Sequence, residues 1–402
     1  MTDIFSTYDS SRYFLDLISF CLLLLPIYYL TSNEAARRAL MVLSCMYLMY
    51  FIAPRLALFY TVFWIGVFLL QRLIARLEKK GRLTMPELVT ALLLALLPML
   101  MWKAQGLRFD VGFNLVTNAV FLFVSKRLWE LDLAYDQIAP IGLSFATFRG
   151  VDLLIKTGLG KIGPLSFGRV MFYGFFPPVQ IVGPIIEYEE VERQAAKADP
   201  SAILEGAFRI AVGALKVFLL AYQLRDSSEV LSAPHNYSVP ALWGNLVCYT
   251  LYFYFNFSGY SDMAIGIAGM FGFKLKENFN FPFLQPNIRE FWNSWHMSLS
   301  RWVQRNVFVP CGGYRPRTQY LALFLAIMTI SMWHGTNLSM VVFGLYHFAG
   351  LVVHRMYSRG KPSPGMNERS ALMTYLFVLP SFPLLTLPFD KALQFYAALI
   401  GL

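Results

Sequence analysis

Charged residues are scarce in this 402-residue chain, and their scarcity excludes an ordinary soluble protein. Only 14% of the residues are Asp, Glu, Lys or Arg, whereas soluble domains carry about 25%. Hydrophobic residues make up 57%, and the mean hydropathy is +0.50. The net charge is +10, but the basic residues lie in short segments between apolar runs. Basic residues in such loops report orientation across a membrane, so we expect no nucleic-acid partner.

Cysteines and the common nucleotide and metal motifs are also few or missing. The four cysteines, Cys21, Cys45, Cys248 and Cys311, lack the spacing of a metal site or a disulfide framework. There is no Walker A, Gly-x-Ser-x-Gly or His-Glu-x-x-His motif. We therefore expect no metal and no bound cofactor, and we interpret Cys311 as a small hydrophobic residue. Any reaction on this chain must draw its energy from an activated co-substrate.

Long apolar runs predict an all-α fold, a polytopic membrane helix bundle. A helix needs about 20 apolar residues to cross the hydrocarbon core of a bilayer. Several runs are short or interrupted, so we expect about 10–12 membrane segments, some re-entrant or interfacial. No long linker separates them, which indicates a single domain over residues 1–402. The clearest runs are Tyr13–Leu30, Ala39–Ala53, Leu56–Leu70, Glu87–Trp102, Ile138–Ile155, Glu205–Leu224, Ala241–Phe257, Tyr320–Met332 and Leu338–His354.

The basic residues predict how the chain crosses the membrane. Arg37 and Arg38 follow the first run, and a basic cluster at residues 72–82 follows the third, whereas Asp3 and Asp9 precede the first. Basic loops stay on the cytoplasmic side. We therefore expect a multi-pass protein of the cytoplasmic (inner) membrane, with its N-terminus outside and the lipid bilayer as its partner. The first run lacks a basic start and a small-residue cleavage site, so it is interpreted as a membrane segment.

Polar residues beside an apolar run mark one candidate site. Asn256, Ser258, Ser261 and Asp262 follow the run that ends at Phe257. Polar groups within a membrane are costly, so each indicates either a functional site or a specific partner. Gly259 lies among them, where a glycine lets two backbones approach closely or the chain bend.

A second polar stretch begins after Pro286. Asn287 can cap a new helix there, with Glu290 at the capping-box position. At about 100° per residue, the apolar residues from Ile288 to Val303 fall on one arc, with polar residues opposite. His296 lies at the seam. This pattern predicts an amphipathic helix of about 20 residues that lines a watery cavity or lies at the membrane interface as a surface helix.

His334 is the second candidate histidine. The run from Gln319 to His334 rises about 22 Å, short of a full crossing, so His334 is expected within the membrane. A histidine there needs protein partners or a cavity, and it is the natural proton carrier near neutral pH. A packing role is the structural alternative. His347 and His354 are interpreted as structural, and His235 as solvated.

These motifs resemble the membrane-bound O-acyltransferase (MBOAT) family. The resemblance is to its bacterial branch, which contains the alginate O-acetylation membrane subunit and the D-alanyl transfer protein of teichoic acid modification. It covers a core of about residues 140–350. The matching segments are Asn256–Gly266, Glu277–Asn280, Ile288–Arg301, Val309–Gly313 and Met332–Gly335, with Pro140–Phe148 and Gly183–Ile186 before them.

The resemblance implies a bundle that encloses a transmembrane tunnel. The family's principal catalytic histidine corresponds to His334 and its second catalytic position to His296. On that basis His334 is expected to act as the general base, and His296 to orient the donor or stabilise the oxyanion, with Asn293 or Ser298 nearby. The residues expected to bind substrate are Trp295, Asn293, Ser298 and Trp333.

The resemblance also implies the substrates. An acyl thioester, acetyl-CoA or an acyl carrier protein, is the expected cytoplasmic co-substrate. The expected acceptors are hydroxyls of an exported polysaccharide or cell-wall polymer, reached through extracytoplasmic partner proteins. Acetyl transfer is favoured over D-alanyl transfer to a teichoic-acid-like polymer. A relay to a separate extracytoplasmic transferase and a membrane transporter remain alternatives, although the chain lacks the repeated halves usual in transporters.

Overall fold

The computed structural model describes residues 11–52, 54–104, 142–180, 182–192, 199–358 and 367–402. Asp3, Asp9 and the start of the predicted run at Ile138 lie outside these ranges, as does the first part of the motif that begins at Pro140. The predicted position of the N-terminus therefore stays a prediction.

Every regular element in this described part is helical. The first half contains α1 (Ser11–Leu30), α2 (Glu34–Ile52), α3 (Pro54–Lys79), α4 (Met85–Ala104), α6 (Leu143–Gly158), α7 (Phe167–Gly174), α8 (Tyr188–Glu192) and α9 (Pro200–Leu215). The second half contains α10 (Tyr222–Leu224), α11 (Ser227–Ser232), α12 (Val239–Met270), α13 (Ile288–Ser294), α14 (Met297–Val303), α15 (Gln319–His334), α16 (Leu338–Tyr357), α17 (Glu368–Val378), α18 (Phe382–Thr386) and α19 (Phe389–Leu399). Short 3₁₀ or π turns lie at η1 (Pro177–Val179), η2 (Lys216–Ala221), η3 (Pro234–Asn236), η4 (Pro282–Leu284), η5 (Gln304–Phe308) and η6 (Leu379–Ser381).

The all-α prediction is confirmed, and the longer helices coincide with the predicted apolar runs. Among the described residues, two helical stretches, Ala57–Lys79 and Leu338–Tyr357, are long and apolar enough to cross a membrane. Ile18–Leu30, Met85–Leu100 and Gln319–His334 are apolar but shorter. The expected number of about 10–12 membrane segments therefore stays a prediction.

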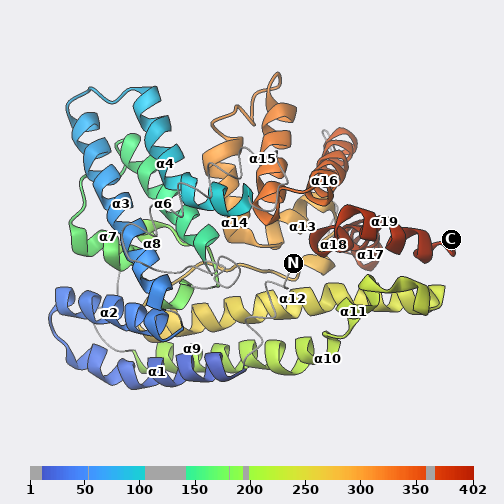
Figure 1. Cartoon of the computed structure of the whole chain (residues 1–402), viewed down its shortest axis with the longest axis horizontal. Coiled ribbons are helices and arrows are strands. Elements are labelled where there is room, and N and C mark those ends of the chain that lie inside the picture. Colours follow the sequence, from blue (N-terminus) through green and yellow to red (C-terminus); the bar gives the residue numbers. More distant parts are fainter. Residues whose placement is uncertain (1–10, 53, 105–141, 181, 193–198, 359–366) are drawn as a thin grey trace.

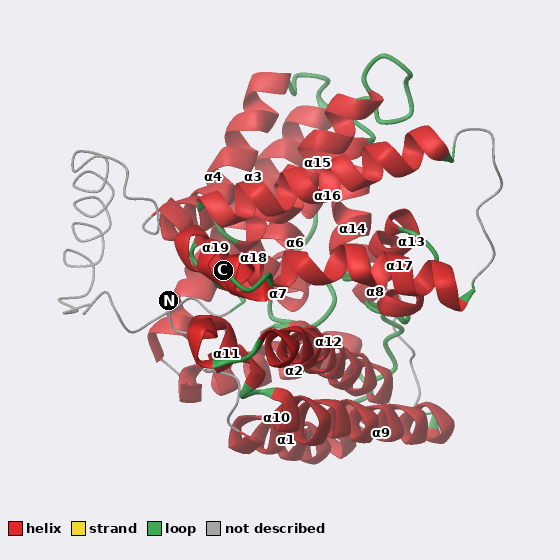
Figure 2. Cartoon of the chain, turned by 90° about the vertical axis from the view of Figure 1, so that its right-hand side faces the viewer, coloured by secondary structure: helices red, strands yellow, loops and turns green. Residues whose placement is uncertain are grey.

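Two sets of helices cross one another. In Figure 1, α1, α2, α9 and α12 lie across the lower part of the molecule, while α3, α4 and α15 stand steeply above them. Both Figure 1 and Figure 2 show α9 alongside α12 in the lower set. The two short helices α13 and α14 lie above α12, in the part of the molecule that also holds α15 and α16. The segments that carry the sequence motifs, on α12, α13, α14 and α15, thus meet where the steep helices stand on the lower ones.

Glycines allow α9 and α12 to pack with their backbones in contact. A Cβ atom at Gly259 would lie 2.7 Å from the carbonyl oxygen of Gly213, and one at Gly266 would lie 2.6 Å from that of Gly206. Each helix carries its two glycines seven residues apart, on one face. Helices in membranes pack through small residues in this way, because van der Waals contact replaces the hydrophobic effect. The predicted role of Gly259 in a close approach is confirmed.

Replacing Gly259 with alanine is expected to destabilise the protein by about 1–3 kcal/mol, because the new methyl group meets a backbone oxygen that cannot move aside. The free energy of unfolding in mixed detergent micelles measures this loss. Gly244→Ala is the matched control on the same helix, since a Cβ there meets nothing within 4 Å. Equal stability of the two variants would contradict the close packing.

The polar segment Asn256–Asp262 was expected to follow the end of a helix, and this expectation is wrong. The segment lies within α12, which continues to Met270. Its charge is neutralised from the neighbouring helix. Arg209 on α9 lies 3.0 Å from the Asp262 carboxylate, and Lys216 in η2 lies 2.6 Å from its other oxygen. Ion pairing with α9 therefore permits the helix to continue where the sequence suggested its end.

The predicted continuous helix from Ile288 is also interrupted. Its start is confirmed, since the Asn287 side chain accepts a hydrogen bond from the Glu290 backbone N–H at 3.0 Å. However, α13 ends at Ser294 and α14 begins at Met297, with η5 continuing from Gln304. The apolar arc is preserved in separate pieces, and the break falls at the candidate histidine, His296.

Candidate active site

His296 occupies the break between α13 and α14 in a left-handed backbone conformation. Its φ angle is 42°, and it is one of two non-glycine residues with positive φ among those described. This conformation costs an L-residue about 1–2 kcal/mol, and such strain gathers at functional sites. The side chain is buried, with only 2% of its surface exposed. The break thus turns a histidine inward that a continuous helix would have left at the polar seam.

The loop residue Asn278 stabilises the break. Its backbone carbonyl accepts a hydrogen bond from the Met297 N–H at 2.8 Å, and its side-chain Oδ1 accepts one from the Ser298 N–H at 3.1 Å. These two amides begin α14 and would otherwise be unsatisfied. The same Oδ1 lies 3.1 Å from Nδ1 of the His296 ring. One amide side chain therefore fixes both the backbone and the imidazole.

Ser298 joins this arrangement to a distant loop. Its hydroxyl donates to Asn278 Oδ1 at 2.8 Å and accepts from the Ile185 backbone N–H at 2.9 Å. On the other side, the Asn278 amide nitrogen donates to Ser261 Oγ on α12 at 3.0 Å. The surroundings of His296 are therefore held by α12, α14 and the segment that precedes α8.

Aromatic rings surround the other side of the His296 imidazole. The ring centroid lies 4.7 Å from that of Phe257 on α12, 5.4 Å from that of Trp333 on α15 and 6.4 Å from that of Phe145 on α6. Within the part of the chain that the structure describes, the buried Nε2 atom has no hydrogen-bond partner. An unpaired buried polar atom costs about 1–3 kcal/mol and calls for a functional explanation.

His334 lies close to His296, and both imidazole rings contact the ring of Trp333. It is the last residue of α15 and is half-buried. The centroids of Trp333 and His334 are 4.5 Å apart, and those of His296 and Trp333 are 5.4 Å apart. The two imidazole centroids therefore lie less than 10 Å from one another.

The other predicted substrate-binding residues divide into two groups. Ser298 and Trp333 contact His296 directly. Trp295 is buried in an aromatic cluster and stacks on Phe253 and Phe291. Asn293 is exposed and donates to Glu290, so the structure does not bring it to the histidine pair.

Two of the remaining histidines have the surroundings expected of them. His347 is buried and its Nε2 lies 3.0 Å from Ser381 Oγ, which fits the structural role expected of it. His235 is exposed, also as expected. In the described part of the chain, no group of three or more His, Cys, Asp or Glu residues could hold a metal ion.

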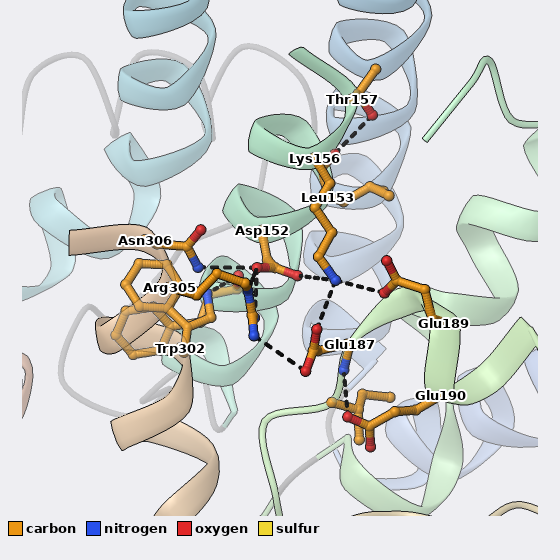
Figure 3. Close-up of polar contacts among 12 residues, drawn as sticks. Asp152, Leu153, Lys156, Thr157, Glu187, Glu189, Glu190, Trp302, Arg305 and Asn306 are labelled. Atoms are coloured by element: carbon orange, nitrogen blue, oxygen red, sulfur yellow. Dashed lines mark hydrogen bonds and ion pairs between the residues drawn. The ribbon is translucent and has the colours of Figure 1, made fainter. Parts of the chain in front are cut away.

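A charged cluster stabilises the elements around the site (Figure 3). At its centre, the side chain of Asp152 on α6 is 1% exposed. The Arg305 guanidinium and the Asn306 amide donate to one of its oxygens at 2.7 Å and 3.0 Å. Lys156, one turn later on α6, lies 3.3 Å from the other oxygen. Two cations from different elements thus share one buried carboxylate.

Glu187 extends the cluster to the loop before α8. Its carboxylate pairs with Lys156 at 2.8 Å, Lys276 at 2.7 Å and Arg305 at 3.2 Å. Burial alone would raise the pKa of Glu187, but the hydrogen bonds from both lysines and the charge of Arg305 lower it to about 2. The carboxylate is therefore ionised throughout the physiological pH range. Ile185, two residues earlier, is the donor to Ser298, so the cluster anchors a loop that contacts the site.

Sequence reasoning assigned no role to Asn278 or to Asp152. Asn278 was visible only as part of the motif Glu277–Asn280. Asp152 lies in an apolar run, where a charged residue is costly and requires a partner. Its partner Arg305 is more than 150 positions away in the sequence. Spacing along the chain could not reveal either contact.

The sequence matches a known family over most of its length. Residues 47–382 match the model of the "MBOAT, membrane-bound O-acyltransferase family". Over 248 residues, the chain is 32% identical to "Probable alginate O-acetylase AlgI" of Pseudomonas aeruginosa, covering 60% of this chain and 48% of that protein. The match therefore spans about half the length of that relative.

Two further relatives carry other names. The chain is 29% identical over 273 residues to the teichoic acid D-alanyltransferase of Bacillus subtilis, covering 61% of this chain and 67% of that protein. It is 34% identical over 196 residues to the peptidoglycan O-acetyltransferase of Helicobacter pylori, covering 47% and 37% respectively. The three names describe acyl transfer to alginate, teichoic acid and peptidoglycan.

Proposed function

Because this chain belongs to the membrane-bound O-acyltransferase (MBOAT) family, we propose that it transfers an acyl group, in the first instance acetyl, from a cytoplasmic thioester to hydroxyls of an exported cell-surface polysaccharide. The observation that carries this proposal is the histidine pair. Two imidazoles less than 10 Å apart, one of them buried with an unpaired nitrogen, lie at the junction of α12, α14 and α15.

The chemistry needs one proton carrier between two substrates. A histidine of the pair removes the proton from the acceptor hydroxyl while its oxygen attacks the thioester carbonyl carbon. The carbon–sulfur bond then breaks, and the same proton passes to the leaving sulfur, so that an ester and a free thiol result. General base catalysis of this kind contributes about 10²–10⁴-fold. The family pattern assigns the role of general base to His334. It assigns to His296 the role of orienting the donor or stabilising the oxyanion.

Acetyl is the favoured acyl group. Two of the three relatives described above are named for O-acetylation and one for D-alanyl transfer. D-alanyl transfer to a teichoic-acid-like polymer is the second candidate, supported by the B. subtilis relative. In either case the proposal places the protein in the inner membrane with its N-terminus outside. A tunnel through the bundle would admit the thioester from the cytoplasm and the polymer, with its partner proteins, from outside.

Acyl transfer can be tested with the full chain in lipid nanodiscs. Radiolabelled acetyl-CoA is supplied together with alginate, peptidoglycan fragments or lipoteichoic acid, and label bound covalently to polymer is counted. The proposal expects labelled ester on at least one polymer, released by mild alkali. In sealed vesicles, uptake of label without ester formation would instead indicate a transporter, and would overturn the proposal.

A further inference from the structure

We propose that Trp333 is a catalytic residue, whose indole N–H donates a hydrogen bond to the oxyanion that forms on the thioester carbonyl. This inference rests on the proposed function and deepens it, because it assigns one atom of the site to the charge that develops during transfer. The roles that the family pattern assigns to His334 and His296 are unchanged.

The indole N–H of Trp333 is a buried donor without a partner. Trp333 is the penultimate residue of α15, and within the described residues its Nε1 atom makes no hydrogen bond. An indole nitrogen can only donate, and a buried tryptophan usually satisfies it. The fold does so for Trp302, whose Nε1 donates to the Phe148 carbonyl at 2.9 Å. A donor left unpaired beside two candidate catalytic groups is suited to an acceptor that arrives with the substrate.

The rings around Trp333 explain why the protein supplies no acceptor. The Trp333 centroid lies 6.0 Å from those of Phe145 and Phe148 on α6, and phenylalanine has no acceptor atom. The other two neighbours are the imidazoles of His296 and His334, at 5.4 Å and 4.5 Å. Phe145, Trp333 and His334 are each only half-buried, so packing does not seal this side of the pair.

The distance between Trp333 and His334 suits one tetrahedral intermediate. A base lies about 3 Å from the attacking oxygen, and an oxyanion donor lies about 3 Å from the charged oxygen on the same carbon. Two protein nitrogens can therefore serve one carbon when they are within about 8 Å of each other. The ring centroids of Trp333 and His334 are 4.5 Å apart. A single substrate carbonyl can thus reach both groups.

The indole acts on the charge that forms when the hydroxyl attacks. The acceptor oxygen bonds to the carbonyl carbon while His334 takes its proton, and the π electrons of the carbonyl move onto its oxygen. Trp333 Nε1–H donates to this negative charge. When the carbon–oxygen double bond forms again, the carbon–sulfur bond breaks, and the imidazolium gives its proton to the departing sulfur. A donor that bonds most strongly to the oxyanion lowers the barrier more than it tightens substrate binding.

Trp333→Phe removes the N–H but keeps an aromatic ring. Loss of one oxyanion donor costs about 10²–10³-fold in kcat, so we expect a decrease of that size in acetyl transfer to the polymer that the wild type labels. KM for acetyl-CoA is expected to change by less than about threefold, because the hydrogen bond is made mainly in the transition state.

Trp292→Phe is the matched control. Its Nε1 is also buried and unpaired in the described part of the chain, where its ring contacts are Phe291, Phe343 and His347. The control variant is expected to transfer acetyl at the wild-type rate. An equal loss of kcat in the two variants would show that the effect is not specific to Trp333, and would overturn the proposal.

A change in the substrate separates hydrogen bonding from packing. In the dithioester analogue of acetyl-CoA, sulfur replaces the carbonyl oxygen, and sulfur is a weak hydrogen-bond acceptor. If Trp333 donates to this atom, the loss caused by Trp333→Phe should be at least about tenfold smaller with the dithioester than with acetyl-CoA. A ring that acts only by packing would give the same loss with both donors, which would contradict the assignment.

An isosteric replacement decides the matter even if Trp333→Phe does not fold. β-(3-Benzothienyl)alanine at position 333 keeps the two fused rings and places sulfur where the N–H was, and the same loss of about 10²–10³-fold in kcat is expected. Wild-type kcat in this variant would overturn the assignment and leave the proposed function intact. A wild-type protein that forms no ester on any polymer would instead overturn the proposed function.

Discussion

His334→Ala and His296→Ala are each expected to lower acyl transfer by about 10²–10⁴-fold, since each removes one side of a shared reaction centre. The double variant is expected to be scarcely worse than the poorer single variant, as is usual for groups that act as a unit. Neither loss is expected to unfold the protein, because Asn278 keeps its hydrogen bonds to Ser298 when the His296 ring is removed, and His334 is half-buried at the end of α15. Covalent acyl transfer to polymer measures the effect, with thermal unfolding as the measure of integrity.

Two other histidines provide controls for this experiment. His235→Ala removes an exposed histidine and is expected to leave transfer unchanged. His347→Ala removes a buried one that contacts Ser381, and is expected to lower stability more than the catalytic rate of the folded fraction. Strictly additive losses at His334 and His296 would mean that the two residues do not act in one reaction.

Asp152→Ala is expected to destabilise the protein by about 3–5 kcal/mol, because it leaves the buried Lys156 and the half-buried Arg305 without their shared carboxylate. Arg305 and Lys156 both lie within 3.3 Å of Asp152, and its side chain is almost fully buried. In the variant, the charges of Lys156 and Arg305 would stay partly desolvated, with only Glu187 and Glu189 left to pair with them. The free energy of unfolding in mixed detergent micelles measures the loss.

Asp226→Ala is the matched control for Asp152. Asp226 also pairs with an arginine, Arg225, but its side chain is 78% exposed. Exposed pairs contribute about 0–1 kcal/mol, so little change is expected. If Asp152→Ala cost no more than Asp226→Ala, the cluster in Figure 3 would not be the anchor that the structure indicates.

Apolar runs predicted the helices well because length and composition suffice to specify them. The apolar run Tyr320–Met332 predicted a helix, and α15 (Gln319–His334) extends it by one residue at its start and two at its end. The cap at Asn287 followed from a local side chain and the residue three positions later. A helix and its N-cap depend on residues close together in the sequence, so a local sequence pattern can predict them.

The break at His296 could not be predicted, because its cause lies elsewhere in the chain. The residues from Ile288 to Val303 have the periodicity of one helix, and nothing among them demands an interruption. Asn278, 18 residues earlier than His296, supplies the hydrogen bonds that replace those of a continuous helix. The same reasoning explains the continuation of α12 through Asp262, which depends on Arg209 on another helix.

The sequence therefore pointed to the two histidines that the fold brings together, but not to the residues that support them. His296 and His334 were recognisable as ionisable groups in or beside apolar segments. Asn278 and Asp152 act through contacts between segments that are distant in sequence, and only the fold brings these together.

A structure with a thioester analogue tests the central claim most directly. An acetyl-CoA analogue with a methylene group in place of the sulfur cannot transfer its acetyl group, and cryo-electron microscopy can locate it in the full-length protein. Our account predicts the acetyl carbonyl between His296 and His334, with space for a hydroxyl oxygen about 3 Å from a ring nitrogen. An analogue bound with its carbonyl away from both imidazoles would contradict a reaction centre at this pair.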